Sequence, residues 1–559
     1  MASLLLSRRD LDFLLYEWLD VTSLPSEHTR ETYDAVLDLA EQIATKDFAT
    51  HNRRNDLEEP RFVDGKVVLH EEVGKALKAY GDAGFIGAGM DASVGGMQLP
   101  AVICQALMGW FHAANVGTAA YPLLTVANAN LLAAHGSPEM IERFVLPMVE
   151  GRYFGTMCLS EPQAGSSLAD ITTKAERQED GSYRVTGNKM WISAGEHDLS
   201  ENIVHLVLAK VPGGPPGSKG ISLLVVPKYL EDGSRNGVTL TGINHKMGFR
   251  GTVNTVLSFE GAVGHLVGEE NRGLPYMFHM MNEARIGVGL GATALGYTGY
   301  LHSLDYARSR PQGRSGKDAT TPQVPIIEHP DVRRMLLAQK SYVEGALALN
   351  LYCGKLVDQG EELLLGMLTP IAKSWPSQWC LEANSLAIQV LGGYGYTREY
   401  PVEQFYRDNR LNPIHEGTHG IQALDLLGRK ATMDGGAGLT KLAETIEATC
   451  VRAPEPYATQ LRDVVARIVE VTQKVWDAGD VALSLANATP YLEAVGHTVI
   501  AWMWLEQLLA AEGKDGDFYE GKRRGAQYFF AWELPKTGPQ LDLVASLDRT
   551  TLDMESRYF

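Results

Sequence analysis

The chain has 559 residues, of which 45% are hydrophobic and 21% charged, as in ordinary globular proteins and unlike disordered chains. At a usual domain size of about 150 residues, this length predicts three or four domains. The 50 basic and 68 acidic residues give a formal net charge of −18, which opposes binding to nucleic acid or to an anionic membrane.

The cysteines and the N-terminus bear on the compartment. The cysteines are odd in number and scattered, without the Cys-x-x-Cys spacing of a zinc site or a redox pair: Cys104, Cys158, Cys353, Cys380 and Cys450. At the N-terminus a short apolar run precedes Arg8 and Arg9, the reverse of a secretory signal. We expect a reducing cytoplasmic location, no metal site and no membrane span.

Residues 34–150 have the spacing of amphipathic helices, with apolar positions three and four apart, as at Val73, Leu77 and Tyr80. Near Gly155 the pattern changes to short β-prone runs separated by turn-forming clusters: 183–185, 203–208, 221–226 and 253–259. These runs predict a β-rich domain of about a hundred residues.

Helical spacing returns after residue 274 and continues to residue 430, which predicts a helix bundle. The stretch 311–325 contains Pro and Gly, and we expect an exposed loop there between two long helices. A glycine cluster at 434–438 predicts a hinge before a last helical domain. In that domain the basic cluster 522–524 could bind a phosphate, although a solvated charged face is the plainer interpretation.

Glycines between residues 287 and 296 superficially match a dinucleotide-binding fingerprint. A Rossmann turn follows a buried strand, whereas these glycines follow and continue a helical run at 276–284. We therefore predict that they allow helices to pack closely. The sequence also contains no P-loop, zinc-protease motif or nucleophile-elbow serine.

Two segments could bind a flat heterocycle. Segment 157–166 reads MCLSEPQAGS and offers amides and hydroxyls to a polar ring edge and a pyrophosphate. Segment 189–193 reads KMWIS, and in a regular strand Trp191 and Ser193 fall on one side, which places an aromatic plane beside a hydrogen-bond donor. Taken singly, a turn or a buried tryptophan explains each segment equally well.

A third segment joins the glycine-rich run 389–396 to 412–422, where Glu416 precedes Gly417 and the backbone can approach a ligand closely. A lone Glu-Gly-Thr sequence is also typical of a helix cap. The combination of the three segments, in this order and in these domain types, favours a binding site.

These motifs resemble those of the acyl-CoA dehydrogenase family over residues 40–430. Leu-Ser-Glu-Pro-Gln-Ala-Gly-Ser-Ser from Leu159 is similar to the first family signature, Asn282-Glu-Ala-Arg285 to the thioester-side helix, and Gln389 to Thr418 to the second signature and catalytic loop. The resemblance implies an α+β, mainly helical fold with an N-terminal helical domain, a central β-barrel, a C-terminal four-helix bundle and an additional helical domain. The expected boundaries are an extension at 1–39 and domains at 40–154, 155–274, 275–432 and 433–559.

The resemblance also implies FAD as cofactor and assigns residues to it. Those expected to line the isoalloxazine are Met157, Leu159, Ser160, Trp191 and Ser193. Those expected near the adenosine-diphosphate part of a neighbouring subunit's FAD are Arg310, Gln389, Gly392 and Gly393, with Thr418 and Gly420 in the loop under that cofactor. Residues implied on the substrate side are Ser166, Asn282, Arg285 and Gly417.

The implied reaction is the oxidation of a saturated acyl-CoA to trans-2-enoyl-CoA, a step of fatty acid β-oxidation. Glu416 matches a family base that removes the α proton while the β hydrogen leaves as hydride for flavin N5. In the family, the backbone N–H of this residue and a flavin hydroxyl stabilise charge on the thioester oxygen, and a dry pocket is expected to raise the pKa of the base. Some members carry the base just before the arginine, where this chain has Ala284. Glu283, one residue earlier, is expected to point elsewhere.

The resemblance implies partners as well. An N-terminal extension and an extra helical tract are similar to those of larger bacterial members and very-long-chain enzymes, in which the added domain favours a homodimer. Electrons are expected to pass to an electron-transfer flavoprotein. Three alternatives remain open from the sequence: a flavin oxidase or monooxygenase on the same fold, a nucleic-acid-binding flavoprotein relative, which the charge of −18 disfavours, and an inactive homologue, which Glu416 disfavours.

Overall fold

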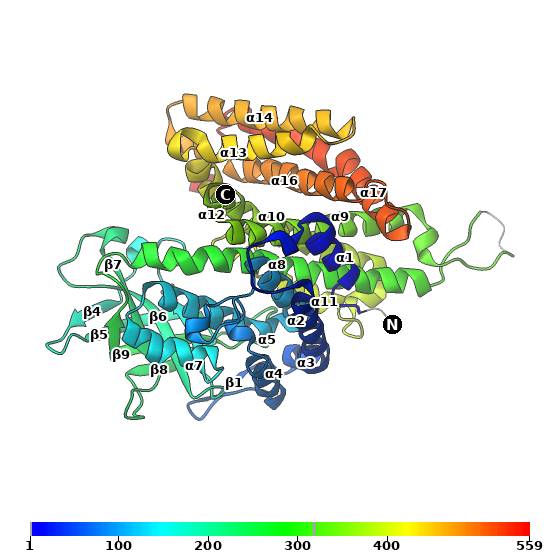
Figure 1. Ribbon diagram of the computed structural model, residues 1–559. Coiled ribbons are helices and arrows are strands. Elements are labelled where there is room, and N and C mark those ends of the chain that lie inside the picture. The colour runs from blue at the N-terminus through cyan, green and yellow to red at the C-terminus, as the bar shows by residue number, and fades with distance from the viewer. Residues whose placement is uncertain (1–2, 317–319) are drawn as a thin grey trace. The chain divides into compact units, whose positions relative to one another are not determined.

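The structure is a computed structural model that describes residues 3–316 and 320–559 (Figure 1). The chain folds as two compact units, which we call the β-containing unit (Ser26–Gly287) and the helical unit (Met1–Pro25 with Val288–Phe559). Helix α8, Gly273–Ser309, contributes its first part to the former and its second part to the latter. In the described residues, no helix combines the length and the apolar character needed to cross a membrane.

The β-containing unit begins with helices and a small hairpin. These elements are α2 (Arg30–Ile43), α3 (Ala49–Leu57), β1 (Arg61–Val63), β2 (Lys66–Val68), α4 (Glu71–Asp82), α5 (Ala101–His135), α6 (Pro138–Met140) and α7 (Leu146–Val149). The apolar residues at helical spacing, Val73, Leu77 and Tyr80, are buried on one face of α4, as predicted. The long apolar helix α5 is kinked at Asn115, which has non-helical dihedral angles.

A seven-stranded sheet follows. Its strands are β3 (Tyr153–Cys158), β4 (Lys174–Arg177), β5 (Tyr183–Ser193), β6 (Asn202–Lys210), β7 (Ile221–Pro227), β8 (Val238–Ile243) and β9 (Asn254–Leu266). Strand β3 pairs in parallel with β6, in a register that places Met157 opposite Leu206. Helix α5 anchors this pair, because the amide of Asn128 donates to the carbonyl oxygens of Thr156 at 3.0 Å and Val204 at 2.9 Å. The backbone at the end of β3, where the segment 157–166 begins, is therefore fixed in position.

The predicted barrel is not a closed barrel. Pairings run from β6 through β7, β9 and β5 to β4, but β4 and β6 are paired at a single position, Lys174 with Lys210. Strand β4 forms a four-position ladder with β5 but meets β6 at that one position. The expected β-rich domain is thus present as a curved sheet.

The described residues of the helical unit form mainly helices, joined by turns and loops. They are α1 (Arg8–Asp12), the second part of α8, α9 (Pro330–Gln359), α10 (Glu362–Leu391), α11 (Val402–Asn409), α12 (His419–Asp425), α13 (Met433–Cys450), α14 (Tyr457–Asp477), α15 (Val481–Leu485), α16 (Ala488–Ala510), α17 (Asp517–Tyr528), α18 (Thr537–Ala545) and α19 (Thr550–Asp553). Within this unit α16 packs on α9 and α10 on one side and on α13 and α14 on the other (Figure 1).

Glycines of α8 permit close helix packing, as predicted. A Cβ atom at Gly289 would lie 1.9 Å from the carbonyl oxygen of Ala372, and one at Gly296 would lie 2.7 Å from Cβ of Cys380. Both contacts are with α10. These glycines are packing residues inside a helix and do not form a nucleotide-binding turn.

Two predicted breaks coincide with features of the helical unit. Asp434, Gly435 and Gly436 have left-handed dihedral angles that interrupt α13. The expected loop at 311–325 lies between the end of α8 and the start of α9, and residues 317–319 of it lie outside the described residues.

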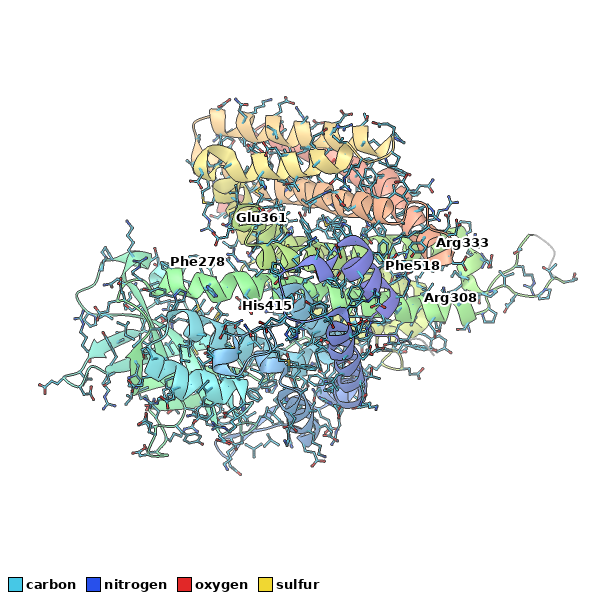
Figure 2. The ribbon with its side chains drawn as sticks, in the orientation of Figure 1. Phe278, Arg308, Arg333, Glu361, His415 and Phe518 are labelled. Atoms are coloured by element: carbon cyan, nitrogen blue, oxygen red, sulfur yellow. The ribbon has the colours of Figure 1, made fainter. Side chains whose placement is uncertain are left out.

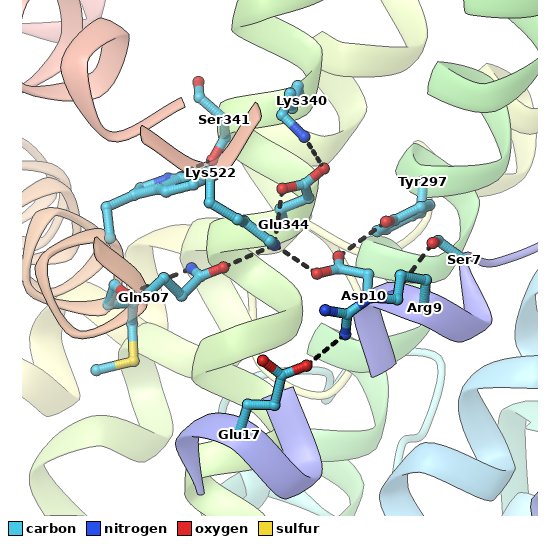
Figure 3. A network of polar contacts seen from close by, with 12 residues as sticks. Ser7, Arg9, Asp10, Glu17, Tyr297, Lys340, Ser341, Glu344, Gln507 and Lys522 are labelled. Carbon is cyan, nitrogen blue, oxygen red and sulfur yellow. Dashed lines mark hydrogen bonds and ion pairs between the residues drawn. The ribbon is translucent and has the colours of Figure 1, made fainter. Parts of the chain in front are cut away.

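The basic cluster at 522–524 is not a uniform solvated face, contrary to the plainer interpretation. Lys522 is fully buried, and its ammonium group forms ion pairs with Asp10 of α1 and with Glu344 of α9 (Figure 3). Lys522 Nζ also donates to Oε1 of Gln507 at 2.8 Å, and the Tyr297 hydroxyl donates to Asp10 at 2.8 Å. The network joins the N-terminal segment to the C-terminal helices.

Candidate active site

The first and second site segments lie against each other in the β-containing unit. The amide of Met190 donates to the carbonyl oxygen of Ser160 at 3.0 Å. Ser160 follows β3 and Met190 lies near the end of β5, so this bond brings Ser160 beside the residue preceding Trp191. The resemblance assigns residues of both segments to the isoalloxazine, and this bond joins them across thirty positions of the sequence.

Trp191 projects from a β-bulge. The pairing of β5 with β9 is irregular between Lys189 and Ile192, and Trp191 has a φ of +66°. The regular alternation expected for Trp191 and Ser193 is therefore interrupted. The indole is 58% exposed, unusual for a tryptophan in a sheet, and its ring can receive a planar ligand. The strained backbone and the exposed ring together are typical of a binding position.

A buried ion pair supports the Ser160 turn. Lys189 Nζ donates to the carbonyl oxygen of Leu159 at 2.9 Å and to Glu161 Oε1 at 3.0 Å, and both charged side chains are buried. The Glu161 carboxylate also accepts bonds from the backbone amides of Thr172 at 2.7 Å and Thr173 at 3.0 Å. Burial raises the pKa of Glu161, but Lys189 and these donors outweigh it and lower the pKa to about 2.

The remaining candidate residues of this unit differ in exposure. Ser193 is half-buried, and its hydroxyl lies 3.4 Å from the amide nitrogen of Asn254. Met157 is buried, Leu159 is half-buried and Ser166 is exposed.

The first part of α8 carries the residues assigned to the thioester side. Asn282 is exposed, whereas Arg285 is buried. Between them, Glu283 accepts a hydrogen bond from the amide of Asn130 on α5 at 2.9 Å. Removal from water raises the pKa of Glu283 to about 7, and the bond from Asn130 acts in the lowering direction.

In the helical unit, the candidate base lies in a turn of left-handed backbone. Glu416 has a φ of +51° and Gly417 a φ of +88°. Such a conformation costs a non-glycine residue about 1–2 kcal/mol. At Gly417 a Cβ atom would lie 2.4 Å from Nε2 of Gln422, so a side chain there would displace the amide that bonds this turn. Glu416 is partly buried.

Two side chains donate hydrogen bonds to backbone carbonyl oxygens of this turn. The buried Lys373 of α10 donates from Nζ to the carbonyl oxygens of Asn412 and Gly417, each at 2.7 Å. Gln422 Nε2 donates to the carbonyl oxygen of Glu416 at 3.1 Å. Just before Glu416, His415, labelled in Figure 2, bonds the Asn412 side chain at 2.9 Å. Every bond here restrains the backbone around Glu416.

The residues assigned to a neighbouring subunit's cofactor lie on the surface of the helical unit. Arg310, Gln389, Gly392 and Gly393 are exposed in the single chain. Beside them Tyr396 is 90% exposed. Thr418 caps α12, its hydroxyl accepting a bond from the amide of Ile421 at 3.3 Å, and Gly420 is exposed on the first turn.

The sequence analysis did not identify the residues that support the Ser160 turn and the Glu416 turn. Glu161 was read only as part of a motif, and Lys373 was not considered. A signal for Lys373 was present, because it is the single charged residue between Glu362 and Glu382 of this helix. The five cysteines are all free, and four of them are buried.

Family models match almost the whole chain in the order expected for one family. They are the acyl-CoA dehydrogenase N-terminal domain at residues 30–152, the middle domain at 156–262, the C-terminal domain at 271–431 and the acetyl-CoA dehydrogenase C-terminal-like domain at 442–555. The chain belongs to the acyl-CoA dehydrogenase family. Its members are FAD-dependent oxidoreductases, and the resemblance seen in the sequence is confirmed.

Curated relatives of this acyl-CoA dehydrogenase match over nearly their full length. The 3-methylmercaptopropionyl-CoA dehydrogenase of Ruegeria pomeroyi is 37% identical, with 93% of this chain and 94% of the relative covered. The broad-specificity linear acyl-CoA dehydrogenase FadE5 of Mycobacterium tuberculosis is 32% identical, with 99% of each chain covered.

A solved structure shows the same fold. The acyl-CoA dehydrogenase of Bacillus anthracis, complexed with FAD, matches with a TM-score of 0.79 at 19% identity, over 97% of this chain and 93% of that one. The similarity of fold therefore includes the C-terminal helices of this acyl-CoA dehydrogenase.

Proposed function

We propose that this dehydrogenase oxidises a saturated acyl-CoA to the trans-2-enoyl-CoA, with Glu416 as the base that removes the α proton. The observation that carries the proposal is the strained, multiply bonded turn at Glu416 and Gly417, in which Lys373 and Gln422 fix the backbone of a partly buried carboxylate. A fixed carboxylate is what α-proton abstraction requires, because a general base must stay within hydrogen-bond reach of the carbon acid.

The proton step also needs charge stabilisation on the thioester oxygen. We assign this role to the backbone N–H of Glu416, which the same turn orients. A preorganised donor of this kind contributes about 3 kcal/mol to such a step. Asn282 and Arg285 of α8, Gly417 and Ser166 are proposed to bind the CoA thioester.

The residues around Trp191 fit a flavin. The exposed indole on its bulge offers a plane, Ser160 and Ser193 offer hydroxyls, and Glu161 with Lys189 holds the turn that carries Ser160. When bound, FAD accepts the two electrons and the hydrogen that leaves the β carbon. Met157 and Leu159 would supply the apolar side chains of the flavin-binding site.

Two further proposals concern partners. The exposed Arg310, Gln389, Gly392 and Gly393 would contact the FAD of a second subunit, which makes the enzyme a homodimer, and Thr418 with Gly420 would lie under that cofactor. An electron-transfer flavoprotein is the proposed acceptor of the electrons.

The test is a single turnover without oxygen. Purified holoenzyme is mixed with butyryl-CoA, longer straight-chain acyl-CoAs and 3-methylmercaptopropionyl-CoA, and the flavin absorbance and the CoA products are followed. We expect at least one thioester to bleach the flavin with formation of an equal amount of enoyl-CoA. Absence of bleaching with the whole panel, or bleaching without an enoyl product, would refute the proposal.

A further inference from the structure

His419, the first residue of α12, lies three residues after Glu416 and is held from two directions. Its Nδ1 is 2.5 Å from the hydroxyl oxygen of Ser374 on α10. Its Nε2 is 3.4 Å from Oε1 of Glu493 on α16, a contact that is an ion pair when the imidazole is protonated. The imidazole therefore connects the Glu416 turn to a helix of the C-terminal tract.

Ser374 is the neighbour of Lys373 in α10, and the two side chains contact the same turn and the helix start that follows it. Lys373 bonds the carbonyl oxygens of Asn412 and Gly417, whereas Ser374 contacts His419. Both side chains are fully buried, so this part of α10 is a rigid base for the turn. The contact of His419 with Glu493 links this end of the turn to the C-terminal tract.

Glu493 is itself fixed within that tract. Gln540 of α18 donates from Nε2 to Oε2 of Glu493 at 3.0 Å, which leaves Oε1 toward His419. The Glu493 side chain is 25% exposed and that of His419 16%, so the contact is largely shielded from water. A shielded, oriented pair restrains position more strongly than a surface ion pair does.

We infer that Glu493 is a positioning residue for the reaction: through His419 it sets the placement of the Glu416 turn and so gives the C-terminal helices a part in proton abstraction. The inference rests on the proposed role of Glu416. Loss of Glu493 leaves the His419 imidazole with Ser374 as its described side-chain partner, while the backbone amide of His419 still donates to the carbonyl oxygen of Pro413 at 3.0 Å. The turn then gains freedom at the His419 end. A shift of about 1 Å in a catalytic group costs up to about 100-fold in rate.

The experiment measures the rate of flavin bleaching by saturating acyl-CoA without oxygen, in holoenzyme of wild type, Glu493→Ala, His419→Asn and the double variant. Bleaching is a single turnover, so a fraction of misfolded enzyme lowers its amplitude and leaves its rate unchanged. We expect Glu493→Ala to lower the rate about tenfold, with the half-saturating acyl-CoA concentration changed by less than about threefold. The matched control is Glu470→Ala, which removes an exposed glutamate of α14 paired with Arg467 and is expected to keep the wild-type rate.

The double variant tests whether the effect of Glu493 passes through His419. If Glu493 acts through His419, Glu493→Ala has no further effect once His419 is changed, and the double variant bleaches at the rate of His419→Asn. A wild-type rate in Glu493→Ala, or an effect of the same size in both backgrounds, would overturn the inference. These outcomes differ from failure of the proposed function, in which Glu416→Gln bleaches at the wild-type rate.

Discussion

Lys373 Nζ lies 2.7 Å from the carbonyl oxygen of Gly417, the residue that follows the proposed base. A buried ammonium group thus holds the backbone of the catalytic turn directly, and with Asn412 as its second acceptor it joins both ends of the turn. The placement of Glu416 is therefore expected to depend on residues that do not touch substrate.

Replacing Lys373 by Met should lower activity more than binding. Two buried carbonyl oxygens would lose a charged donor, which costs about 2 kcal/mol in the free energy of unfolding. The loosened turn should also slow flavin bleaching by acyl-CoA at least about tenfold. The control is Lys474→Met on the exposed face of α14. A bleaching rate within twofold of wild type in Lys373→Met would contradict the positioning role.

Trp191→Ala should weaken FAD binding without unfolding the protein. The indole is 58% exposed and contributes little to the core, whereas stacking on a flat ring is worth about 1 kcal/mol or more. Titration of apoprotein with FAD, followed by flavin fluorescence, should show an affinity at least about fivefold weaker. Trp532→Ala removes a tryptophan of similar exposure, 56%, and is expected to bind FAD as wild type does. Equal affinities in all three proteins would remove Trp191 from the flavin seat.

Glu161→Gln should lose stability in a pH-dependent way. Near neutral pH the change leaves the buried Lys189 without its counter-ion, which costs about 3 kcal/mol. In wild type the pKa of Glu161 is lowered from 4.5 to about 2. Its ionised form therefore stabilises the fold above pH 4.5, and this contribution is lost as the pH falls toward 2.

Urea unfolding at a series of pH values checks this sign. The difference in the free energy of unfolding between wild type and Glu161→Gln should be constant from pH 7 to 5 and should shrink below pH 4.5. A difference that stays constant or grows on acidification would mean that Glu161 is not held ionised by Lys189.

Lys522 and Arg524 should respond very differently to replacement by Met. Lys522→Met leaves the buried carboxylates of Asp10 and Glu344 without a shared partner and should cost about 3–5 kcal/mol. Arg524 is exposed and paired only with Glu520 among its described ion pairs, so Arg524→Met should cost less than about 1 kcal/mol. Urea unfolding of the two variants measures the contrast. A small effect in both would show that the network in Figure 3 contributes little to stability.

Local patterns were sufficient for much of the architecture. The helical spacing at Val73, Leu77 and Tyr80, the change of pattern near Gly155 and the break at Asp434 to Gly436 are properties of neighbouring residues, and each appears in the structure. The closed barrel was a wrong expectation: β4 and β6 pair at a single position, and the number of β-prone runs in the sequence does not reveal how strands distant in the chain pair.

Features that depend on residues distant in sequence were not predictable in the same way. Lys522 was interpreted as exposed or phosphate-binding because its partner Asp10 lies 512 residues away. The left-handed φ of Trp191 arises from a bulge against β9, which the alternation of a single strand does not reveal. The candidate base Glu416 was found by its motif, whereas its supports Lys373 and His419 act through contacts that only the folded chain brings together.

The rate of flavin bleaching in Glu416→Gln holoenzyme is the measurement that tests the central claim most directly. Gln keeps the size and the backbone of Glu416 but cannot accept the α proton. The account predicts a protein that retains its yellow flavin and its wild-type unfolding midpoint while anaerobic bleaching by acyl-CoA slows at least about a thousandfold. Bleaching of this variant at a rate near that of wild type would show that another group removes the proton.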